Sequence, residues 1–221
     1  MREERVNKIK AVIFDMDGVL VDSMPYHYLA WYEALRPYGI RVSCFEVFAK
    51  EGERWEKTLT ALLRREGIKP TPDILRKIFL RRKRIFRRYF KRYLFENVKQ
   101  FIYCLKKKGY RLGLVTGTPT QELTRILPKR LRKMFDVIVA GDHVKKGKPH
   151  PEPYLMAIHK LALLPKEAVV IENAPFGIKS AKRAGIFCIG LTTSLPRQYL
   201  SEADKIVERI EDIPPIIERS C

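Results

Sequence analysis

The chain has 221 residues, the length of one domain or of one domain that carries an insertion. Hydrophobic residues make up 46% of it, which argues against intrinsic disorder, and no apolar run approaches the ~18 residues that a membrane span needs. The formal net charge is +19, which makes anions candidate partners. The apolar stretch Ala11–Phe14 is too short for a signal peptide, and we expect a cytoplasmic protein.

The cysteine and amide contents narrow the compositional class further. The cysteines are scattered without a C-x-x-C pair, which argues against a zinc knuckle or a redox motif and suits a reducing compartment. The four cysteines are Cys44, Cys104, Cys188 and Cys221. Asn and Gln together number six, whereas charged residues make up 31%, a bias that resembles the proteins of thermophiles.

After one initial strand, the first 95 residues have the pattern of helices. The segment Lys10–Phe14 predicts a buried strand, and Ser23 with Pro25 is typical of the cap and first turn of a helix. Ser43 begins a capping box, and Thr71, followed by a proline, predicts the start of a long basic helix. No further strand is predicted before about residue 95.

After Asn97 short apolar strands alternate with helices. The predicted strands are Arg111–Val115, Val137–Ala140, Val169–Ile171, Phe187–Ile189 and Ile206–Val207, and the predicted helices include Pro153–Leu161, Phe176–Ala184 and Ile213–Ile217. This alternation predicts the α/β class, with a Rossmann-like parallel sheet covered on both faces and an inserted α-helical domain. We place the core at residues 1–20 and 96–221 and the helical insert at 21–95.

The insert contains a strongly basic stretch. The segment Arg64–Arg92 holds thirteen basic and two acidic residues. It can be a solvated helix face, a funnel for a small anion or a nucleic-acid footprint. Apolar residues alternate with the cations at a spacing that favours contact with a core over base stacking, which makes nucleic acid the least favoured partner. These residues are Ile78, Phe79, Ile85, Phe86 and Tyr89.

Polar residues gather at the predicted ends of the core strands. In open α/β sheets reactive groups collect where the strands reach their C-terminal ends. The residues at those ends and in the loops beyond them are Asp15, Asp17, Thr116, Lys148, Glu172 and Asn173. A carboxylate pair, a hydroxyl, a cation and a second acidic cluster together suit phosphoryl transfer assisted by a divalent metal.

The first of these motifs is Asp15-Met16-Asp17-Gly18. A carboxylate at a strand end can attack phosphorus and form an aspartyl-phosphate, and Asp17 can then protonate the leaving oxygen and later deprotonate water. Gly18 allows the backbone to turn sharply beside the site. A capped strand and turn is the alternative interpretation, because Asp and Gly are common in turns.

The next two motifs are less specific when each is taken alone. Thr116 and the backbone N–H groups from Gly117 onward can hold phosphoryl oxygens at the start of a helix. Lys148 can neutralise both the nucleophile and the phosphate. Ordinary turn chemistry and a solvated loop lysine are the alternatives. A P-loop is excluded, because Pro149 stands where a Ser or Thr is required and the glycine spacing is one residue too long.

The last motif predicts a magnesium site. A hard cation such as Mg²⁺ prefers oxygen ligands and keeps some of its waters. Asp15, the backbone carbonyl of Asp17 and the pair Glu172 and Asn173 can supply such ligands. A turn of the Asx type before a helix is the alternative for this pair.

The order and spacing of these motifs resemble those of the haloacid dehalogenase (HAD) superfamily. The matching segments are D-M-D-G-V at 15–19, Thr116, Lys148 in G-K-P-H-P-E-P-Y, and I-E-N-A-P-F-G-I-K-S-A-K-R-A-G at 171–185. The resemblance spans residues 9 to about 192. A helical insert between the first two motifs is similar to the small cap of the β-phosphoglucomutase-like branch. The resemblance therefore implies a HAD-like core with a helical cap domain.

The resemblance also implies a role for each motif residue. The nucleophile, which is also a Mg²⁺ ligand, would be Asp15, and the general acid/base, which lends its carbonyl to the metal, would be Asp17. The other members would be the phosphoryl-binding Thr116, Gly117 and Lys148 and the metal ligands Glu172 and Asn173. The family usually has a second carboxylate where Asn173 stands, so an uncharged amide replaces an anionic ligand here.

Three residues of the insert resemble cap residues of the same branch. His27 lies ten residues after Asp17, as in mutase-like members, and Glu51 resembles the cap glutamate of pyrophosphatase-like members. Arg54 matches the mutase-like cap arginine with an offset of one residue. The N-terminal turn of a helix is the alternative interpretation of residues 51–54.

The function that the resemblance implies is a Mg²⁺-dependent phosphohydrolase of a small phosphorylated metabolite. A β-phosphoglucomutase-type mutase and an inorganic pyrophosphatase are enzymatic alternatives, and a basic nucleic-acid-binding protein on a HAD scaffold is the non-enzymatic one. The resemblance argues against dehalogenation, because HAD dehalogenases lack the acid that Asp17 supplies. We expect a small anionic phosphate as substrate, no membrane contact, and a monomer or small homo-oligomer.

Overall fold

The structure, a computed structural model, describes residues 9–219 and contains a six-stranded parallel sheet. The strands are β1 (Ala11–Phe14), β2 (Arg111–Val115), β3 (Val137–Val139), β4 (Ala168–Glu172), β5 (Phe187–Leu191) and β6 (Lys205–Val207). Their order across the sheet is β3-β2-β1-β4-β5-β6, with every neighbouring pair parallel. The predicted α/β class is thereby confirmed. Cys221 and the first eight residues of the predicted core lie outside the described residues.

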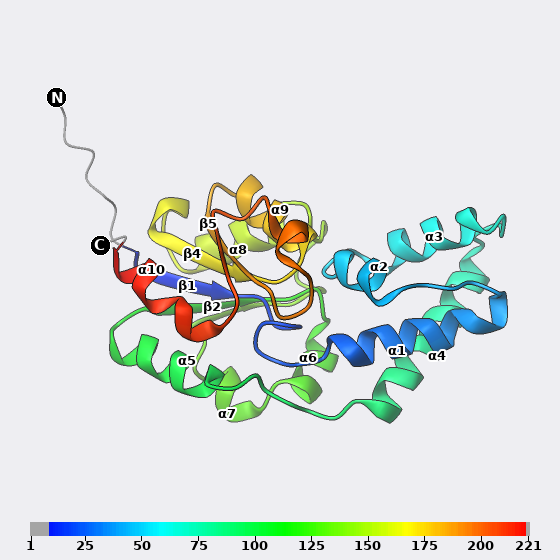
Figure 1. Cartoon of the computed structure of the whole chain (residues 1–221), viewed down its shortest axis with the longest axis horizontal. Helices are drawn as coiled ribbons and strands as arrows, with labels where there is room; N and C mark the ends of the chain where they lie inside the picture. Colours follow the sequence, from blue (N-terminus) through cyan, green and yellow to red (C-terminus); the bar gives the residue numbers. More distant parts are fainter. Residues whose placement is uncertain (1–8, 220–221) are drawn as a thin grey trace.

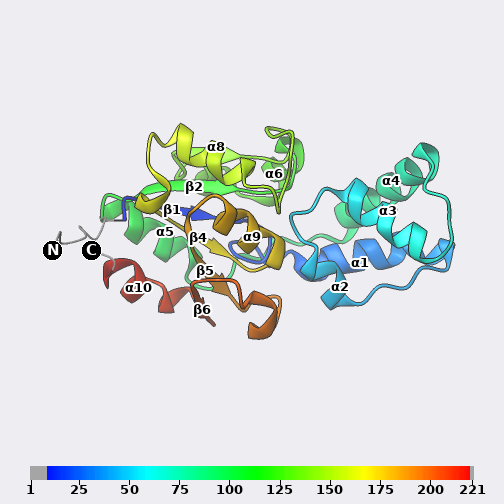
Figure 2. The same ribbon diagram turned by 90° about the horizontal axis from the view of Figure 1, so that it is seen from above.

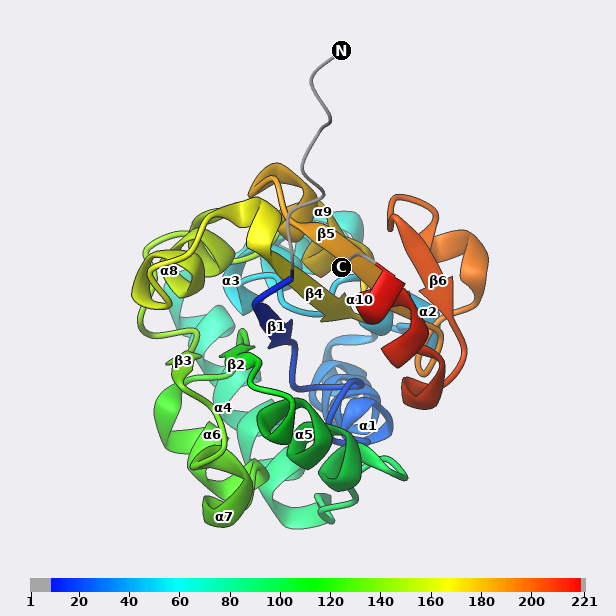
Figure 3. The ribbon, with the colours of Figure 1, turned by 90° about the vertical axis from the view of Figure 1, so that its left-hand side faces the viewer.

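Helices cover both faces of this sheet. They are α5 (Val98–Lys107), α6 (Thr120–Ile126), α7 (Lys129–Arg132), α8 (Glu152–Lys160), α9 (Pro175–Arg183) and α10 (Pro214–Arg219). Figure 3 shows α8 and α9 on one side of the sheet and α5, α6 and α7 on the other. Val12 and Phe14 belong to the apolar cluster with α5, whereas Ala11 and Ile13 belong to the cluster with α8. β1 is apolar throughout because its side chains alternate between the two faces of the sheet and both faces are buried.

Four helices and one short 3-10 turn lie in the described insert between β1 and β2, and three more 3-10 turns lie in the described part of the core. The helices are α1 (Met24–Leu35), α2 (Cys44–Ala49), α3 (Trp55–Arg65) and α4 (Pro72–Tyr89), and the turns are Arg36–Tyr38, Pro165–Glu167, Arg197–Leu200 and Ile210–Asp212. Figures 1 and 2 show the four helices beyond the end of the sheet to which β1 points, opposite the chain termini. They enclose an apolar cluster of their own, which includes Trp31, Leu59 and Ile78.

Two of the three predicted caps form as expected. The Ser43 hydroxyl accepts the backbone N–H of Glu46 at 3.1 Å, and the Thr71 hydroxyl accepts that of Ile74 at 3.4 Å. Ser23 stands at the N-cap position of α1, but its hydroxyl makes no cap hydrogen bond there. It donates to the Asp17 carboxylate instead, so a residue predicted to begin a helix belongs to the polar site.

The predicted strands differ from the observed ones mainly at their ends. The pattern ends the fourth core strand at Ile171, because the next residue is charged. Backbone pairing continues to Glu172, which lies opposite Gly190. The structure thus extends β4 by one residue into the polar site. Among residues 9–219 no helix is both long enough and apolar enough to cross a membrane.

Candidate active site

The candidate site lies where β1 and β4 end. The chain leads from β1 to β2 and β3 on one side of the sheet and from β4 to β5 and β6 on the other, so the strand order switches between β1 and β4. Phe14 pairs with Ile171, and the Asp15 N–H donates to the Ile171 carbonyl at 3.0 Å. Asp15 and Glu172 therefore leave the sheet side by side, at the place where such folds bind ligands.

Lys148 joins these two carboxylates. Its Nζ atom lies 2.6 Å from Asp15 Oδ1 and 2.5 Å from Glu172 Oε1, and all three side chains are buried. Burial alone lowers the pKa of Lys148, but the charges of Asp15 and Glu172 outweigh burial and raise that pKa above its ordinary value. The ammonium group therefore stays charged at physiological pH, as one cation between two carboxyl groups.

Asp17 is held by three side-chain donors. Its Oδ1 accepts from Ser23 Oγ at 2.6 Å and from His27 Nε2 at 3.2 Å, and its Oδ2 accepts from Thr118 Oγ1 at 3.0 Å. Burial would raise the pKa of Asp17, but the hydrogen bonds from His27, Ser23 and Thr118 hold it below its ordinary value. The three donors thus favour the carboxylate form of Asp17.

Arg82 determines which ring nitrogen of His27 carries the proton. The Arg82 Nη2 atom lies 2.7 Å from His27 Nδ1. Because a guanidinium group can only donate, Nδ1 accepts, and the ring proton is on Nε2, from which it is donated to Asp17. Arg82 lies over the Trp31 ring, 5.1 Å from its centroid, and His27 stacks on Phe86. These aromatic contacts fix both partners of the hydrogen bond.

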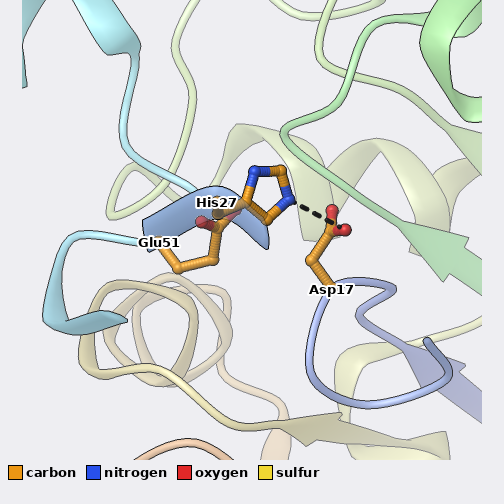
Figure 4. A group of neighbouring side chains, drawn as sticks. All are labelled: Asp17, His27 and Glu51. Atoms are coloured by element: carbon orange, nitrogen blue, oxygen red, sulfur yellow. Dashed lines mark hydrogen bonds and ion pairs between the residues drawn. The ribbon is translucent and has the colours of Figure 1, made fainter. Parts of the chain in front are cut away.

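Glu51 completes a cluster with Asp17 and His27. Figure 4 shows the three side chains converging from the loop after β1, from α1 and from the loop after α2, and one ligand atom of each lies within 4.8 Å of the others. Both ring nitrogens of His27 are engaged, and the Arg82 cation is adjacent, so this cluster is unsuited to a metal ion. Burial raises the pKa of Glu51, which favours a protonated carboxyl beside the Asp17 carboxylate.

Two other oxygens fit the predicted metal. Asp15 Oδ2 and Asn173 Oδ1 are buried and have no hydrogen-bond partner among residues 9–219. Asn173 Nδ2 donates to Ser194 Oγ at 2.9 Å, and a Cβ atom at Gly18 would lie 2.0 Å from this nitrogen. Asn173 thus packs against the loop that carries Asp17. Buried acceptors without partners are costly unless a cation or water engages them, and oxygen ligands suit Mg²⁺.

Glu172 has its oxygens engaged already. Its Oε1 accepts from Lys148 Nζ at 2.5 Å and from the Tyr154 hydroxyl at 2.8 Å. Its Oε2 accepts the backbone N–H groups of Asn173 at 2.9 Å and Ala174 at 3.3 Å. A carboxylate has about four acceptor positions, and protein donors fill them. Of the two residues predicted as ligands at the end of β4, Asn173 is therefore the one with a free oxygen.

The phosphate-binding residues predicted after β2 lie directly beneath the insert. Thr116 is 3% exposed, and its hydroxyl accepts the backbone N–H of Thr118 at 3.1 Å. A Cβ atom at Gly117 would lie 3.3 Å from the Cα of Gly52 in the insert. Glycine at position 117 therefore permits the close approach of the two backbones.

The insert also touches the core through the loop 51–54. The backbone of Glu53 pairs with that of Lys148 in an isolated parallel bridge. Arg54 Nη2 donates to the Val144 carbonyl at 2.6 Å. One guanidinium nitrogen of Arg54, which was predicted to bind substrate, therefore forms a hydrogen bond that links the insert to the core.

A cavity of about 310 Å³ lies between core and insert. The predicted site residues that line it are His27, Glu51, Arg54, Thr116, Gly117 and Lys148. Its apolar wall in the insert includes Trp31, Trp55 and Phe79, and the last two rings stack with centroids 4.0 Å apart. Asp15 and Asp17 contact Lys148 and His27 directly, so the predicted carboxylates reach the same region.

Several residues with contacts in the site, among them Ser194 beside Asn173, were not predicted from the sequence. Ser23 was interpreted as a helix cap, and Arg82 lies within a basic run in which no single cation stands out. Tyr154 lies inside the quoted segment that carries Lys148, and Thr118 lies two residues after Thr116, but nothing in the spacing indicates which carboxylate each one contacts. Their position two or six residues beyond a motif residue is the only signal, and it is weak.

Comparisons with known proteins agree with this geometry. The family model described as haloacid dehalogenase-like hydrolase matches residues 9–185. A phosphorylated carbohydrates phosphatase of Thermotoga maritima is 36% identical over 188 residues, which cover 80% of this chain and 82% of that protein. A phosphoglycolate phosphatase of Salmonella choleraesuis is 31% identical over an alignment that covers 97% of this chain and 94% of that protein.

Solved structures show the same architecture. A putative β-phosphoglucomutase from Bacteroides vulgatus superimposes with a TM-score of 0.84 at 31% identity, covering 96% of this chain and 90% of that one. A hydrolase from Pseudomonas syringae has a TM-score of 0.84 at 23% identity, covers 95% and 98% of the two chains, and supports the fold alone. The family match covers most of the sequence and includes all four motifs, so the chain belongs to the haloacid dehalogenase-like hydrolases.

Proposed function

We propose that this protein is a Mg²⁺-dependent phosphohydrolase that acts on a small phosphorylated metabolite through an aspartyl-phosphate. The observation that carries the proposal is the contact of the buried Lys148 ammonium with Asp15 Oδ1, while Asp17, two residues on, is held by three donors. A nucleophile, a counter-cation and an acid/base thus lie beside one cavity. The phosphatase names of two relatives support the same reaction class.

The chain's own groups divide the reaction between them. Asp15 would attack phosphorus as the P–O bond to the leaving group breaks, and Asp17 would give a proton to that oxygen. Asp17, ionised again, would then take a proton from water as the water attacks phosphorus, and the bond from phosphorus to the Asp15 oxygen would break, which frees Asp15 and releases inorganic phosphate. Lys148 and the Thr116 hydroxyl would hold the phosphoryl oxygens, which is mainly electrostatic work.

Asp15, Asn173 and the Asp17 carbonyl would hold the magnesium ion. The unpartnered oxygens Asp15 Oδ2 and Asn173 Oδ1 support this ligand set. The ion would supply positive charge that offsets repulsion between the attacking carboxylate and the phosphate.

The insert, which we assign to residues 21–95, would act as a cap over the core of residues 1–20 and 96–221. The bridge between Glu53 and Lys148 and the hydrogen bond from Arg54 to Val144 support a closed position of this cap. Closure would exclude bulk water from the acyl-phosphate, and opening would admit substrate.

The cavity supports a carbohydrate phosphate as the substrate class. Its volume of about 310 Å³ leaves room for more than a two-carbon leaving group, and Trp31, Trp55 and Phe79 provide aromatic surface for a sugar ring. Arg82 lines it with a buried Nε–H that has no acceptor among residues 9–219, which a substrate hydroxyl would engage. The name of the Thermotoga relative points to the same class.

Replacement of the nucleophile tests the proposed function. Asp15→Asn keeps the shape of the side chain but removes the attacking anion, so turnover of p-nitrophenyl phosphate with Mg²⁺ should fall at least about 1,000-fold. Asp73→Asn, at an exposed position on α4, is the matched control and should be fully active. An Asp15→Asn enzyme with near-normal turnover would contradict the role of Asp15.

A phosphosugar mutase is the second candidate, favoured by the likeness to the putative β-phosphoglucomutase of Bacteroides vulgatus. In a mutase the aspartyl-phosphate passes to a second sugar hydroxyl instead of water. Incubation with β-glucose 1-phosphate separates the two functions. A phosphohydrolase releases inorganic phosphate, whereas a mutase forms an isomeric sugar phosphate without net phosphate release.

A further inference from the structure

Tyr154 is a buried residue that has no role in the proposed reaction. It lies on α8, has 0% of its surface exposed, and belongs to the apolar cluster on the α8 and α9 side of the sheet. Its hydroxyl nevertheless donates to Glu172 Oε1 at 2.8 Å, and the Lys148 ammonium lies 5.2 Å from the centroid of its ring. Tyr154 therefore contacts both members of the ion pair between Lys148 and Glu172.

The phenol of Tyr154 acts as a permanent donor. Burial raises its pKa well above the ordinary value, and the negative charges of Glu172 and Asp15 raise it further. The hydroxyl keeps its proton at physiological pH and can stabilise only an acceptor. Glu172 Oε1 thus receives one hydrogen bond from a neutral phenol and one from an ammonium group.

These contacts clamp the Glu172 carboxylate from both ends. The backbone N–H groups of Asn173 and Ala174 hold Oε2, and Tyr154 holds Oε1. A Cβ atom at Gly177 would lie 1.7 Å from Oε1, so the first turns of α9 close the remaining side. With Oε1 fixed, the Lys148 ammonium has one defined position, from which it also reaches Asp15 Oδ1.

We propose that Tyr154 is a positioning residue that holds the Lys148 ammonium in place for the phosphoryl group by fixing Glu172 Oε1. This inference rests on the proposed phosphohydrolase function, in which Lys148 binds that group. Without the phenol, Glu172 Oε1 loses a donor and the carboxylate can rotate, so Lys148 is drawn away from the phosphoryl position. Tyr154 itself touches neither the substrate nor the reacting atoms in this account.

Tyr154→Phe tests the proposal, because it removes one hydroxyl and keeps the ring. In the full-length protein with saturating Mg²⁺, we expect the KM for p-nitrophenyl phosphate and the inhibition constant of inorganic phosphate to rise together by roughly 5- to 20-fold. We expect kcat to fall by a smaller factor. Tyr26→Phe, a change of the same kind on α1 outside the site, is the matched control and should leave both constants unchanged. Thermal unfolding reports whether each variant is folded.

A double-mutant cycle with Lys148→Met separates positioning from a general structural role. If Tyr154 acts through Lys148, Tyr154→Phe should weaken phosphate binding in the wild-type background and have little further effect in the Lys148→Met background. Equal losses in both backgrounds, or unchanged phosphate affinity in an active Tyr154→Phe enzyme, would overturn the inference. A wild-type protein that neither binds phosphate nor hydrolyses phosphate esters would refute the proposed function instead.

Discussion

At the scale of single residues, the environment of Asp17 bears most directly on the second half of the proposed reaction. Three donors hold its pKa below the ordinary value, which favours the anion that activates water. Burial also raises the pKa of Glu51, which lies in the same cluster. In the proposed reaction, the lowered pKa of Asp17 suits the second half, in which Asp17 takes a proton from water.

The acid role of Asp17 predicts a dependence on the leaving group. In Asp17→Asn an alkyl phosphate loses the proton that its departing alkoxide needs, and its turnover should fall by about 10³-fold. A p-nitrophenolate group leaves without a proton, so acyl-phosphate formation from p-nitrophenyl phosphate should fall much less. Rapid-quench measurement of the first turnover with both substrates checks this. Equal losses for the two leaving groups would argue against Asp17 as the acid.

The neutral side chain of Asn173 is expected to limit the affinity of the proposed site for Mg²⁺. Its neutral amide oxygen is one of two buried, unpartnered oxygens at the proposed metal site. Asn173→Asp adds an anionic ligand and should tighten Mg²⁺ binding roughly tenfold, or about 1.4 kcal/mol. Asn173→Ala should weaken it by a similar factor. Titration calorimetry measures both, and unchanged affinity in both variants would remove Asn173 from the ligand set.

At the scale of elements, the strands could be predicted but the contacts between distant elements could not. Strands buried on both faces appear in the sequence as continuous apolar runs, which predict β1 and β4. Asp15 and Glu172 are the first acidic residues after those runs, so the sequence places both at the same edge of the sheet. Ser23 and Arg82 could not be found in this way. Each contacts a partner that chain folding, and not sequence spacing, brings near: Asp17 in one case and His27 in the other.

The contacts of the long basic helix α4 could not be predicted from the sequence either. Its cations were open to three interpretations, and several of them make specific contacts within the fold. Lys83 and Arg87 pair with Glu122 on α6, and Arg92, just beyond α4, donates to the carbonyls of Arg125 and Ile126. Part of the basic run therefore ties the insert to the core.

The pairing of Glu122 predicts a pH-dependent contribution to stability. Burial raises the pKa of Glu122, but Arg87 and Lys83 outweigh burial and hold that pKa below its ordinary value of 4.5. The pairing therefore stabilises the fold above pH 4.5, and this contribution is lost as pH falls through the lowered pKa. Glu122→Gln should reduce the unfolding free energy by up to about 1 kcal/mol at pH 7 and by less at pH 3.

Denaturant unfolding of the wild type and Glu122→Gln at the two pH values measures this difference. Glu96→Gln, at an exposed glutamate, is the matched control and should show no such pH dependence. A deficit in Glu122→Gln that is as large at pH 3 as at pH 7 would show that the ion pairs are not its cause.

At the scale of the whole molecule, the cavity lies between two bodies that are far apart in the sequence. The core supplies Asp15, Asp17 and Lys148, and the insert supplies His27 and Glu51. The motifs predicted that Asp15, Asp17 and Lys148 lie together, because each lies at or after the end of a strand of one sheet, but they did not indicate Thr118 or Tyr154. They predicted the insert half only by resemblance, because its contribution depends on how the helices are seated over the sheet.

The central claim is that Asp15 takes up the phosphoryl group. The most direct measurement is acid quenching of the enzyme during turnover, reduction or hydroxylamine trapping of any acyl-phosphate, and mass spectrometry of the peptides. We predict that the modification is found on Asp15 and is missing from Asp15→Asn. Efficient turnover with Asp15 unmodified at every quench time, or trapping at another residue, would contradict the account.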